Sequence, residues 1–288
     1  MPELTFSAIG TSWTVTTEAP VADALRVALM RLVETYDRTW SRFRPDSLVA
    51  QLARKPGSIT LPASAAPLLR LYDTLYRVTG GAVNPLVGSS LESLGYDAGY
   101  SFRSRDQVPA PAWPETVSWS EVPGGTLLRT TAAATIDIGA AGKGQLVDLV
   151  FELLQAAGHG SLTVDAGSDL RHAGPEGLRV GLEHPYDSTR AIGITTLRQG
   201  ALCASAANRR QWGDGLHHIL DAVTGAPTDS VAATWALARD AMTADGLATA
   251  LFFTDPTALA TEFTFDFVRM FSDGRATYSD AMAGVLFS

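Results

Sequence analysis

The order of strand-like and helix-like segments after residue 126 constrains the fold of this 288-residue chain most strongly. One helical segment, 145–157, interrupts a series of strand-like runs, which are 126–130, 135–138, 162–165, 178–182, 192–197 and 201–204. Strands and helices mix without the regular strand–helix–strand alternation that builds a parallel, doubly wound sheet. The order therefore predicts an α+β fold.

The first part of the chain adds a strand pair and two amphipathic helices. Apolar residues alternate from Leu4 to Val15 around a bend at Gly10 and Thr11, as in two paired strands. Composition and spacing predict helices over 20–40 and 64–78, and a loop-rich stretch over 98–125 with one short strand at 117–119. This length is compatible with one large domain or with two intertwined lobes.

Composition excludes several classes of protein. Acidic residues outnumber basic ones by 30 to 22, which disfavours nonspecific nucleic-acid binding. The single cysteine, Cys203, excludes an intramolecular disulfide and an all-cysteine zinc site, and we expect a buried thiol. The start of the chain lacks an export signal, and no apolar run is long enough to cross a bilayer. We therefore expect a soluble, cytoplasmic protein; an extracytoplasmic location would require that a leader had been removed.

Asp245 and Thr249 form a candidate metal site. Residues four apart share one face of a helix, and the segment 243–253 around them is small and apolar. Burying a carboxylate there is costly unless it is paired or bound to a metal. Carboxylate and hydroxyl oxygens suit Mg²⁺ better than zinc. The alternative is that Asp245 caps the helix N-terminus, although Thr243 could do so instead.

Two glycine-rich turns are candidates for binding an anion. The segment 137–144 joins a strand-like run to a helix and contains Lys143, so free N–H groups and a cation could face a phosphate. It matches neither the P-loop nor the dinucleotide-binding fingerprint. The segment 165–169 has a carboxylate at each end, at Asp165 and Asp169. The structural alternatives are a tight strand–helix turn and carboxylates that cap a turn.

The segment 217–225 places two histidines, His217 and His218, before Asp221 and a Thr224–Gly225 turn. Asp221 could orient a working His218 imidazole, although a histidine beside an apolar strand is more often structural. Just upstream, the arginines at 209 and 210 could neutralise phosphate or simply be solvated.

Seven segments, taken in order, resemble the FAD:protein FMN transferases, also called the ApbE flavin transferases. They are Ala-Ile-Gly-Thr at 8–11, Ser-Arg-Phe at 41–43 with Ser47, Asn-Pro at 84–85 with Val-Gly at 87–88, the glycine turn at 137–144 with Asp148, the turn at 165–169, His-Ile-Leu-Asp at 218–221 with Thr-Gly at 224–225, and Ala-Asp at 244–245 with Ala-Thr-Ala at 248–250. The resemblance implies one domain over 1–288, with a cleft between two lobes.

The resemblance also implies a reaction and a site. Family members transfer FMN from FAD to a threonine hydroxyl of an acceptor flavoprotein and release AMP. The implied Mg²⁺ ligands are Asp245, Thr249 and the Gly142 carbonyl, and the implied catalytic residues are His218, as base, and Asp221. The implied FAD-binding residues are Ile9, Ser41, Asn84, Gly139, Lys143, Asp148, Asp165, Gly167, Ser205 and Thr224.

The chain departs from the family pattern at several places. Ile9 replaces the opening methionine, Asn84 an aspartate, Gly142 an alanine and Ala222 a proline. The family's Ala-Thr-Ser-Gly stands as Cys-Ala-Ser-Ala at 203–206, which bears on the pocket mouth and on partner specificity. Two alternatives therefore stay open: a Mg²⁺-dependent FAD pyrophosphatase that yields FMN and AMP, and a flavin-binding protein without catalysis.

Overall fold

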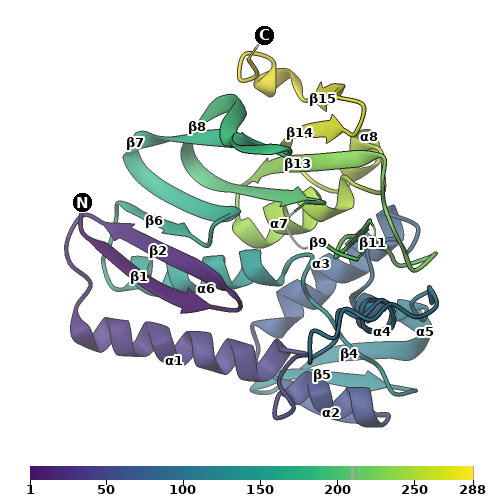
Figure 1. The fold of residues 1–288 in the computed structure, drawn as a ribbon. Helices are drawn as coiled ribbons and strands as arrows, with labels where there is room; N and C mark the ends of the chain where they lie inside the picture. The colour runs from purple at the N-terminus through teal and green to yellow at the C-terminus, as the bar shows by residue number, and fades with distance from the viewer. Residues whose placement is uncertain (209–210, 214, 288) are drawn as a thin grey trace.

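A computed structural model describes residues 1–208, 211–213 and 215–287, which form a large and a small antiparallel sheet with helices between them (Figure 1). In this part of the chain the large sheet has eight strands, in the order β1-β2-β6-β7-β8-β13-β14-β15. They are β1 (Glu3–Ala8), β2 (Thr11–Thr17), β6 (Leu162–Asp165), β7 (Asp169–His184), β8 (Asp187–Ala206), β13 (Val231–Ala238), β14 (Asp266–Phe271) and β15 (Ala276–Tyr278). The α+β class expected from the sequence is confirmed.

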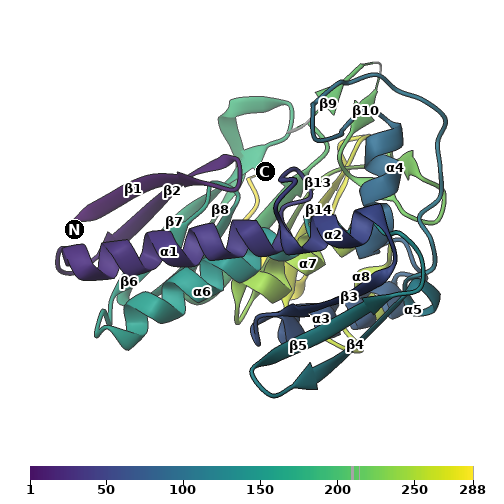
Figure 2. The ribbon, with the colours of Figure 1, turned by 90° about the horizontal axis from the view of Figure 1, so that it is seen from below.

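Two helices, α6 (Gly142–Ala156) and α7 (Ala241–Ala250), contact each other and pack on the large sheet. The long α1 (Asp23–Trp40) runs beside α6 (Figure 2) and lies farther from the sheet than α6 does (Figure 1). Because α6 lies between the sheet and α1, most of its side chains are buried, as its apolar composition requires. Among the described residues, no helix is both long and apolar enough to span a membrane.

The small sheet has the order β3-β5-β4 and lies beyond the helices. Its strands are β3 (Gly57–Leu61), β4 (Val117–Val122) and β5 (Gly125–Thr130). The helix α3 (Ala65–Val78) contacts both this sheet and α7, and so connects the two halves. Shorter elements complete the fold: α2 (Leu48–Arg54), α4 (Gly88–Ser93), α5 (Trp113–Thr116), α8 (Pro256–Leu259), 3₁₀ turns at Pro85–Val87 and Asp280–Met282, and the ribbons β9 (Gln211–Trp212) with β10 (Leu216–His217) and β11 (Leu220–Asp221) with β12 (Ala226–Pro227).

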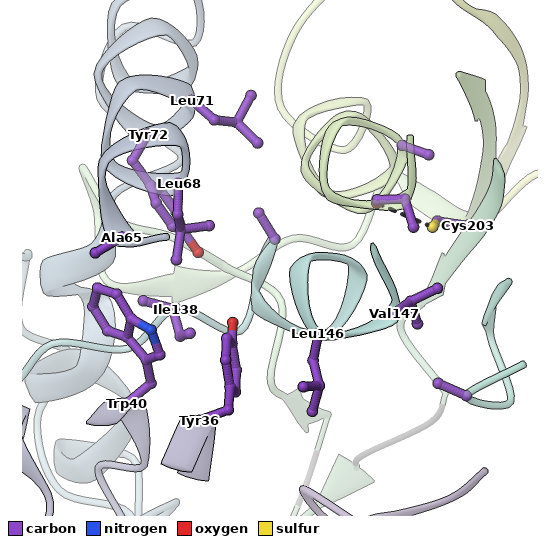
Figure 3. Close-up of a cluster of buried hydrophobic side chains, with 14 of the residues drawn as sticks. Tyr36, Trp40, Ala65, Leu68, Leu71, Tyr72, Ile138, Leu146, Val147 and Cys203 are labelled. Carbon is purple, nitrogen blue, oxygen red and sulfur yellow. Dashed lines mark hydrogen bonds between the residues drawn. The ribbon is translucent and has the colours of Figure 1, made fainter. Parts of the chain in front are cut away.

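One hydrophobic cluster joins these layers. In Figure 3, Tyr36 and Trp40 from α1 and Tyr72 from α3 lie around Ile138, while Leu146 points from α6 toward the α1 side. The same cluster contains buried residues of both sheets, and Cys203 on β8 belongs to it. Its thiol is buried as expected and donates to the Ala241 carbonyl at 3.4 Å.

The expected helices and most expected strands are present, with boundaries shifted by a few residues. The helix expected over 145–157 begins at Gly142, and the expected strands 192–197 and 201–204 are both parts of β8. The strand expected over 135–138 is wrong, because this segment has no regular structure. Its buried residues alternate as in a strand, but the Asp137 N–H donates to the Pro85 carbonyl, outside any sheet.

Candidate active site

Two neighbouring cavities lie where the β1–β2 turn meets the segment that leads into α6. The first, which we call the aromatic chamber, has a volume of about 540 Å³. The second, the polar chamber, has a volume of about 580 Å³. The two chambers share the lining residues Gly10, Tyr96, Asp137, Gly139 and Lys143. Volumes of this size are typical of small-molecule sites, and the shared wall places the chambers side by side.

Aromatic rings from separate parts of the chain line the aromatic chamber. Phe43 stacks on Tyr100 with ring centroids 5.3 Å apart and planes inclined by 6°. Tyr96 stacks on Trp212 at 5.2 Å and 17°. The Arg42 guanidinium lies 4.1 Å from the Phe43 ring centroid, and its Nε donates to Asp137 at 2.5 Å. Such walls suit a flat aromatic ring.

The backbone of the aromatic chamber is strained. Ile9, Tyr100 and Phe102 have φ of 42°, 48° and 50°, and they are the non-glycine residues with positive φ in the described chain. All three line this chamber. Positive φ is unfavourable for bulky and β-branched side chains, and such strain concentrates at functional sites. That all three strained residues line this one chamber is a second indication that the chamber binds a ligand.

The glycine turn at 137–144 forms the wall between the chambers. The Asp137 carboxylate accepts the Gly139 N–H at 2.7 Å and shapes the turn. Lys143, in the first turn of α6, reaches the junction, where its ammonium contacts Ser168 Oγ and lies 2.9 Å from Asp169 Oδ2. Burial acts to lower the Lys143 pKa, but the Asp169 and Asp245 carboxylates outweigh it, so the pKa is raised. The junction therefore holds a fixed positive charge.

Asp245 and Thr249 both line the polar chamber, one turn apart on α7. Asp245 is only 4% exposed, and its Oδ2 accepts the Gly144 N–H at 2.9 Å. The cap of α7 is instead Asp240, which accepts the Thr243 N–H at 2.8 Å. The structure therefore excludes the alternative that Asp245 caps its own helix.

A backbone carbonyl lies beside Thr249. Thr249 Oγ1 donates to the Ala140 carbonyl at 3.3 Å, so hydroxyl, carbonyl and carboxylate oxygens occur in one wall of the polar chamber. The Gly142 carbonyl accepts the Tyr36 hydroxyl at 2.7 Å, and Gly142 lines the aromatic chamber. No three His, Cys, Asp or Glu side chains of the described residues cluster as metal ligands. The donor set here is made of hard oxygens, which fit Mg²⁺.

The two neighbouring histidines have different surroundings. His218 lines the polar chamber, as does Ser205. His217 is buried; its Nδ1 accepts the Ile219 N–H at 3.3 Å and its Nε2 lies 2.8 Å from the Thr228 carbonyl. Burial lowers the His217 pKa. His217 therefore has a structural role, whereas His218 is part of the chamber wall.

The remaining expected site residues divide into two groups. Ile9 and Ser41 line the aromatic chamber, Asn84 and Gly167 line the polar chamber, and Gly139 lines both. Asn84 is also a turn residue, because its side chain accepts the Leu86 N–H and donates to the Pro111 carbonyl. The described lining of the chambers does not include Asp148, Asp165, Asp221 or Thr224. The arginines at 209 and 210 lie outside the described residues.

Asp148 caps the helix that carries Asp245. Its two carboxylate oxygens accept the N–H groups of Ala241 and Met242 at 2.9 and 2.8 Å, and Arg171 donates to it at 2.8 Å. Burial raises its pKa to about 6, although these partners act against the shift. This carboxylate connects α6 to the first turn of α7.

The other three residues outside the chambers shape turns. Asp165 accepts the Gly167 N–H at 2.7 Å, and burial raises its pKa. Asp221 accepts the Val223 N–H at 2.8 Å, and the exposed Thr224 hydroxyl accepts the Ala226 N–H at 3.2 Å. For Asp165 this contact is the turn-capping alternative predicted from the sequence, and Asp221 and Thr224 have the same kind of contact.

The sequence does not predict the aromatic chamber, and it indicates Asp169 only as one of two carboxylates in a turn. Residues 98–102 fall in the stretch predicted to be loop-rich, and residues 95–102 contain two glycines and three aromatic residues, Tyr96, Tyr100 and Phe102. That composition is a usable signal, because exposed aromatic residues in a loop often bind ligands. The partners Phe43 and Trp212 are distant in sequence and carry no local signal.

Comparison with known proteins shows the family of this chain. The model of the ApbE family matches residues 9–264. A FAD:protein FMN transferase of Rhodobacter capsulatus is 28% identical over 266 residues, covering 86% of this chain and 50% of that protein. Another of Treponema pallidum is 29% identical over 293 residues, covering 88% and 78%. The chain thus spans only half the length of the first of these relatives.

The fold is also that of a solved structure. The crystal structure of the ApbE protein from Thermotoga maritima superposes with a TM-score of 0.82 at 23% identity, covering 100% of this chain and 99% of that one. The family match extends over most of the chain and includes both chambers. This chain therefore belongs to the ApbE family.

Proposed function

We propose that this protein transfers FMN from FAD to a threonine hydroxyl of an acceptor flavoprotein, with Mg²⁺, and releases AMP. The observation that carries the proposal is the pair of adjoining chambers, one walled by aromatic rings and the other by oxygen donors, with Lys143 between them. FAD has the matching parts, because a diphosphate joins two halves that each contain a flat ring. Two curated relatives with the name FAD:protein FMN transferase support the same reaction.

In this proposal a flat ring of FAD occupies the aromatic chamber and the diphosphate lies at the junction. The Lys143 ammonium and the first turn of α6 would hold the phosphates, because a helix N-terminus and a cation both favour anions. Ile9 and Ser41 would contact the ring that occupies the aromatic chamber. Gly139, Gly167 and Ser205 would contact the part of FAD that lies in the polar chamber. Asp148 and Asp165 would act indirectly, through the helix and the turn that they cap.

Mg²⁺ would be held by Asp245, Thr249 and a backbone carbonyl. Of the two candidate carbonyls, that of Ala140 lies beside Thr249, whereas that of Gly142 is hydrogen-bonded to Tyr36. We therefore prefer Ala140 as the third ligand. When bound, the ion would neutralise charge on the diphosphate and on the leaving phosphate.

His218 would act as the base. It would take the proton from the incoming threonine hydroxyl, whose oxygen attacks the phosphorus on the FMN side. A new threonine O–P bond forms, the bond from that phosphorus to the bridging oxygen breaks, and AMP leaves with that oxygen. Asp221, which accepts a backbone N–H in the next turn, would support the segment that positions His218.

The test is AMP release from FAD and Mg²⁺, with and without a flavoprotein that has a target threonine. Release that requires the acceptor supports the transferase. Equal release without the acceptor means that water replaces threonine, and the protein is then a pyrophosphatase. FAD binding without AMP under either condition contradicts both enzymes and leaves a flavin-binding protein.

A further inference from the structure

The mechanism above gives Lys143 a role but gives none to Asp169, its ion-pair partner at the junction. Asp169 is fully buried, with 0% exposure, and its Oδ2 lies 2.9 Å from the Lys143 ammonium. Lys143 is the only cation within ion-pair distance of Asp169 among the described residues. The Lys143 side chain retains 19% exposure and lines both chambers. The carboxylate is therefore the inner member of the pair and the ammonium the member that faces a ligand.

The large sheet holds Asp169 in a fixed place. It is the first residue of β7 and pairs with Cys203 of β8 in the sheet register. The turn before it is fixed on both sides, because the Asp169 carbonyl accepts the Ala166 N–H at 2.9 Å and the Ser168 carbonyl accepts the Ala204 N–H at 2.8 Å. A carboxylate so anchored can fix a long, flexible lysine side chain.

Stability alone does not explain why this ion pair is buried. An isolated buried carboxylate is strongly unfavourable, and a buried ion pair seldom gives more stability than apolar side chains of the same volume. Lysine has four rotatable carbon–carbon bonds and would otherwise sample many positions. The ion pair removes that freedom where the two chambers meet.

We propose that Asp169 is a positioning residue that holds the Lys143 ammonium at the junction of the chambers, where the diphosphate of a bound dinucleotide lies. This inference rests on the proposed function for the identity of the ligand. The placement of the Lys143 ammonium by Asp169 is independent of the proposed function and can be tested without any ligand.

The first test uses the chain's two lysines, Lys55 and Lys143. Amine acetylation is followed at each lysine by mass spectrometry over a range of pH, with the exposed Lys55 as the reference for reagent activity. Only the uncharged amine reacts, so the pH midpoint reports the pKa. Burial alone would place the Lys143 midpoint below the usual lysine value of about 10.4, whereas the Asp169 carboxylate, together with that of Asp245, raises it.

In Asp169→Asn we expect Lys143 to react at least about threefold faster relative to Lys55 at pH 9, because the nearest carboxylate that raises its pKa is then neutral. Asp273→Asn, which removes an exposed ion pair with Arg275, should leave the ratio unchanged. A folded Asp169→Asn variant with an unchanged ratio overturns the proposal. If that variant does not fold, a wild-type midpoint below the usual value overturns it as well.

The second test is a double-mutant cycle on the dissociation constant for FAD, with Mg²⁺ present. Lys143→Met should raise the constant about tenfold or more, and Asp169→Asn should raise it severalfold. The double variant should bind no more weakly than Lys143→Met, because Asp169 acts through the lysine. Fully additive losses would overturn the proposal. A wild type that does not bind FAD contradicts the proposed function, while the acetylation result still decides the placement of Lys143.

Discussion

At the residue scale, the adjacent histidines give the clearest contrast, because His218 lines the polar chamber and His217 is buried with both ring nitrogens in contact with backbone groups. We expect His218→Gln to lower the rate of transfer by about 10²-fold or more, the usual contribution of a general base. Its melting temperature should change little. His217→Gln should instead cost about 1–3 kcal/mol of stability, because the buried Ile219 N–H loses its acceptor, the ring Nδ1. Equal activity losses in the two variants, at equal stability, would contradict this assignment.

Asp245 gives the second prediction at this scale. Asp245→Asn keeps an oxygen that can accept the Gly144 N–H but loses the negative charge. We expect Mg²⁺ to bind at least about 100-fold more weakly, because even partners outside the ligand sphere contribute 10–100-fold. Asp240→Asn, at the cap of the same helix, is the control and should retain Mg²⁺ binding. Titration calorimetry with Mg²⁺ measures both variants, and unchanged affinity in Asp245→Asn would place the metal elsewhere.

At the element scale, the close approach of α6 and α7 depends on Gly144. A Cβ atom there would lie 2.1 Å from the Ala241 carbonyl oxygen and 2.7 Å from Asp245 Cβ. Gly144→Ala should therefore push the helices apart and cost about 1–3 kcal/mol or more in urea unfolding. Gly160→Ala is the matched control, because nothing lies within 4 Å of its added Cβ. Equal stability of the two variants would contradict the predicted steric conflict.

The cap that Asp148 provides to α7 gives stability a pH dependence. Burial raises its pKa from 3.8 to about 6, so the folded protein binds this proton more tightly than the unfolded chain. The stability that protonation contributes is complete below about pH 4 and is lost as the pH rises through about 6. Between these pH values the free energy of unfolding of the wild type should fall by up to about 3 kcal/mol relative to Asp148→Asn, since one pKa unit corresponds to about 1.36 kcal/mol. Parallel stability curves for the two proteins would contradict the raised pKa.

Much of the element pattern could be predicted from sequence, and its failures have physical causes. The helices α1, α3 and α6 follow from apolar spacing, because each buries one face or nearly all of its surface. Residues 135–138 misled the prediction because their burial alternates while their hydrogen bonds go to loops. In the site, Asp245 and Thr249 were found because they share one helix. The Lys143–Asp169 pair depends on tertiary contacts, as does the Phe43–Tyr100 stack.

At the scale of the whole molecule, the chambers lie where elements from both halves of the chain meet. The β1–β2 turn, the segment before α6 and the turn before β7 line the chambers together with α7 and residues 218–220. No single element contains the site, so its assembly requires the complete fold. The Cys-Ala-Ser-Ala segment at 203–206 lies beside the polar chamber, which its residues Ala204, Ser205 and Ala206 line. An acceptor threonine that approaches the diphosphate would pass near these small side chains.

The central claim is that the two chambers serve group transfer to a protein. The most direct measurement is the intact mass of a flavoprotein acceptor after incubation with the wild-type protein, FAD and Mg²⁺. We expect an increase equal to one esterified FMN, located on a threonine by peptide mapping and absent with Asp245→Asn. An acceptor of unchanged mass in a reaction that consumes FAD and forms free FMN and AMP would contradict it.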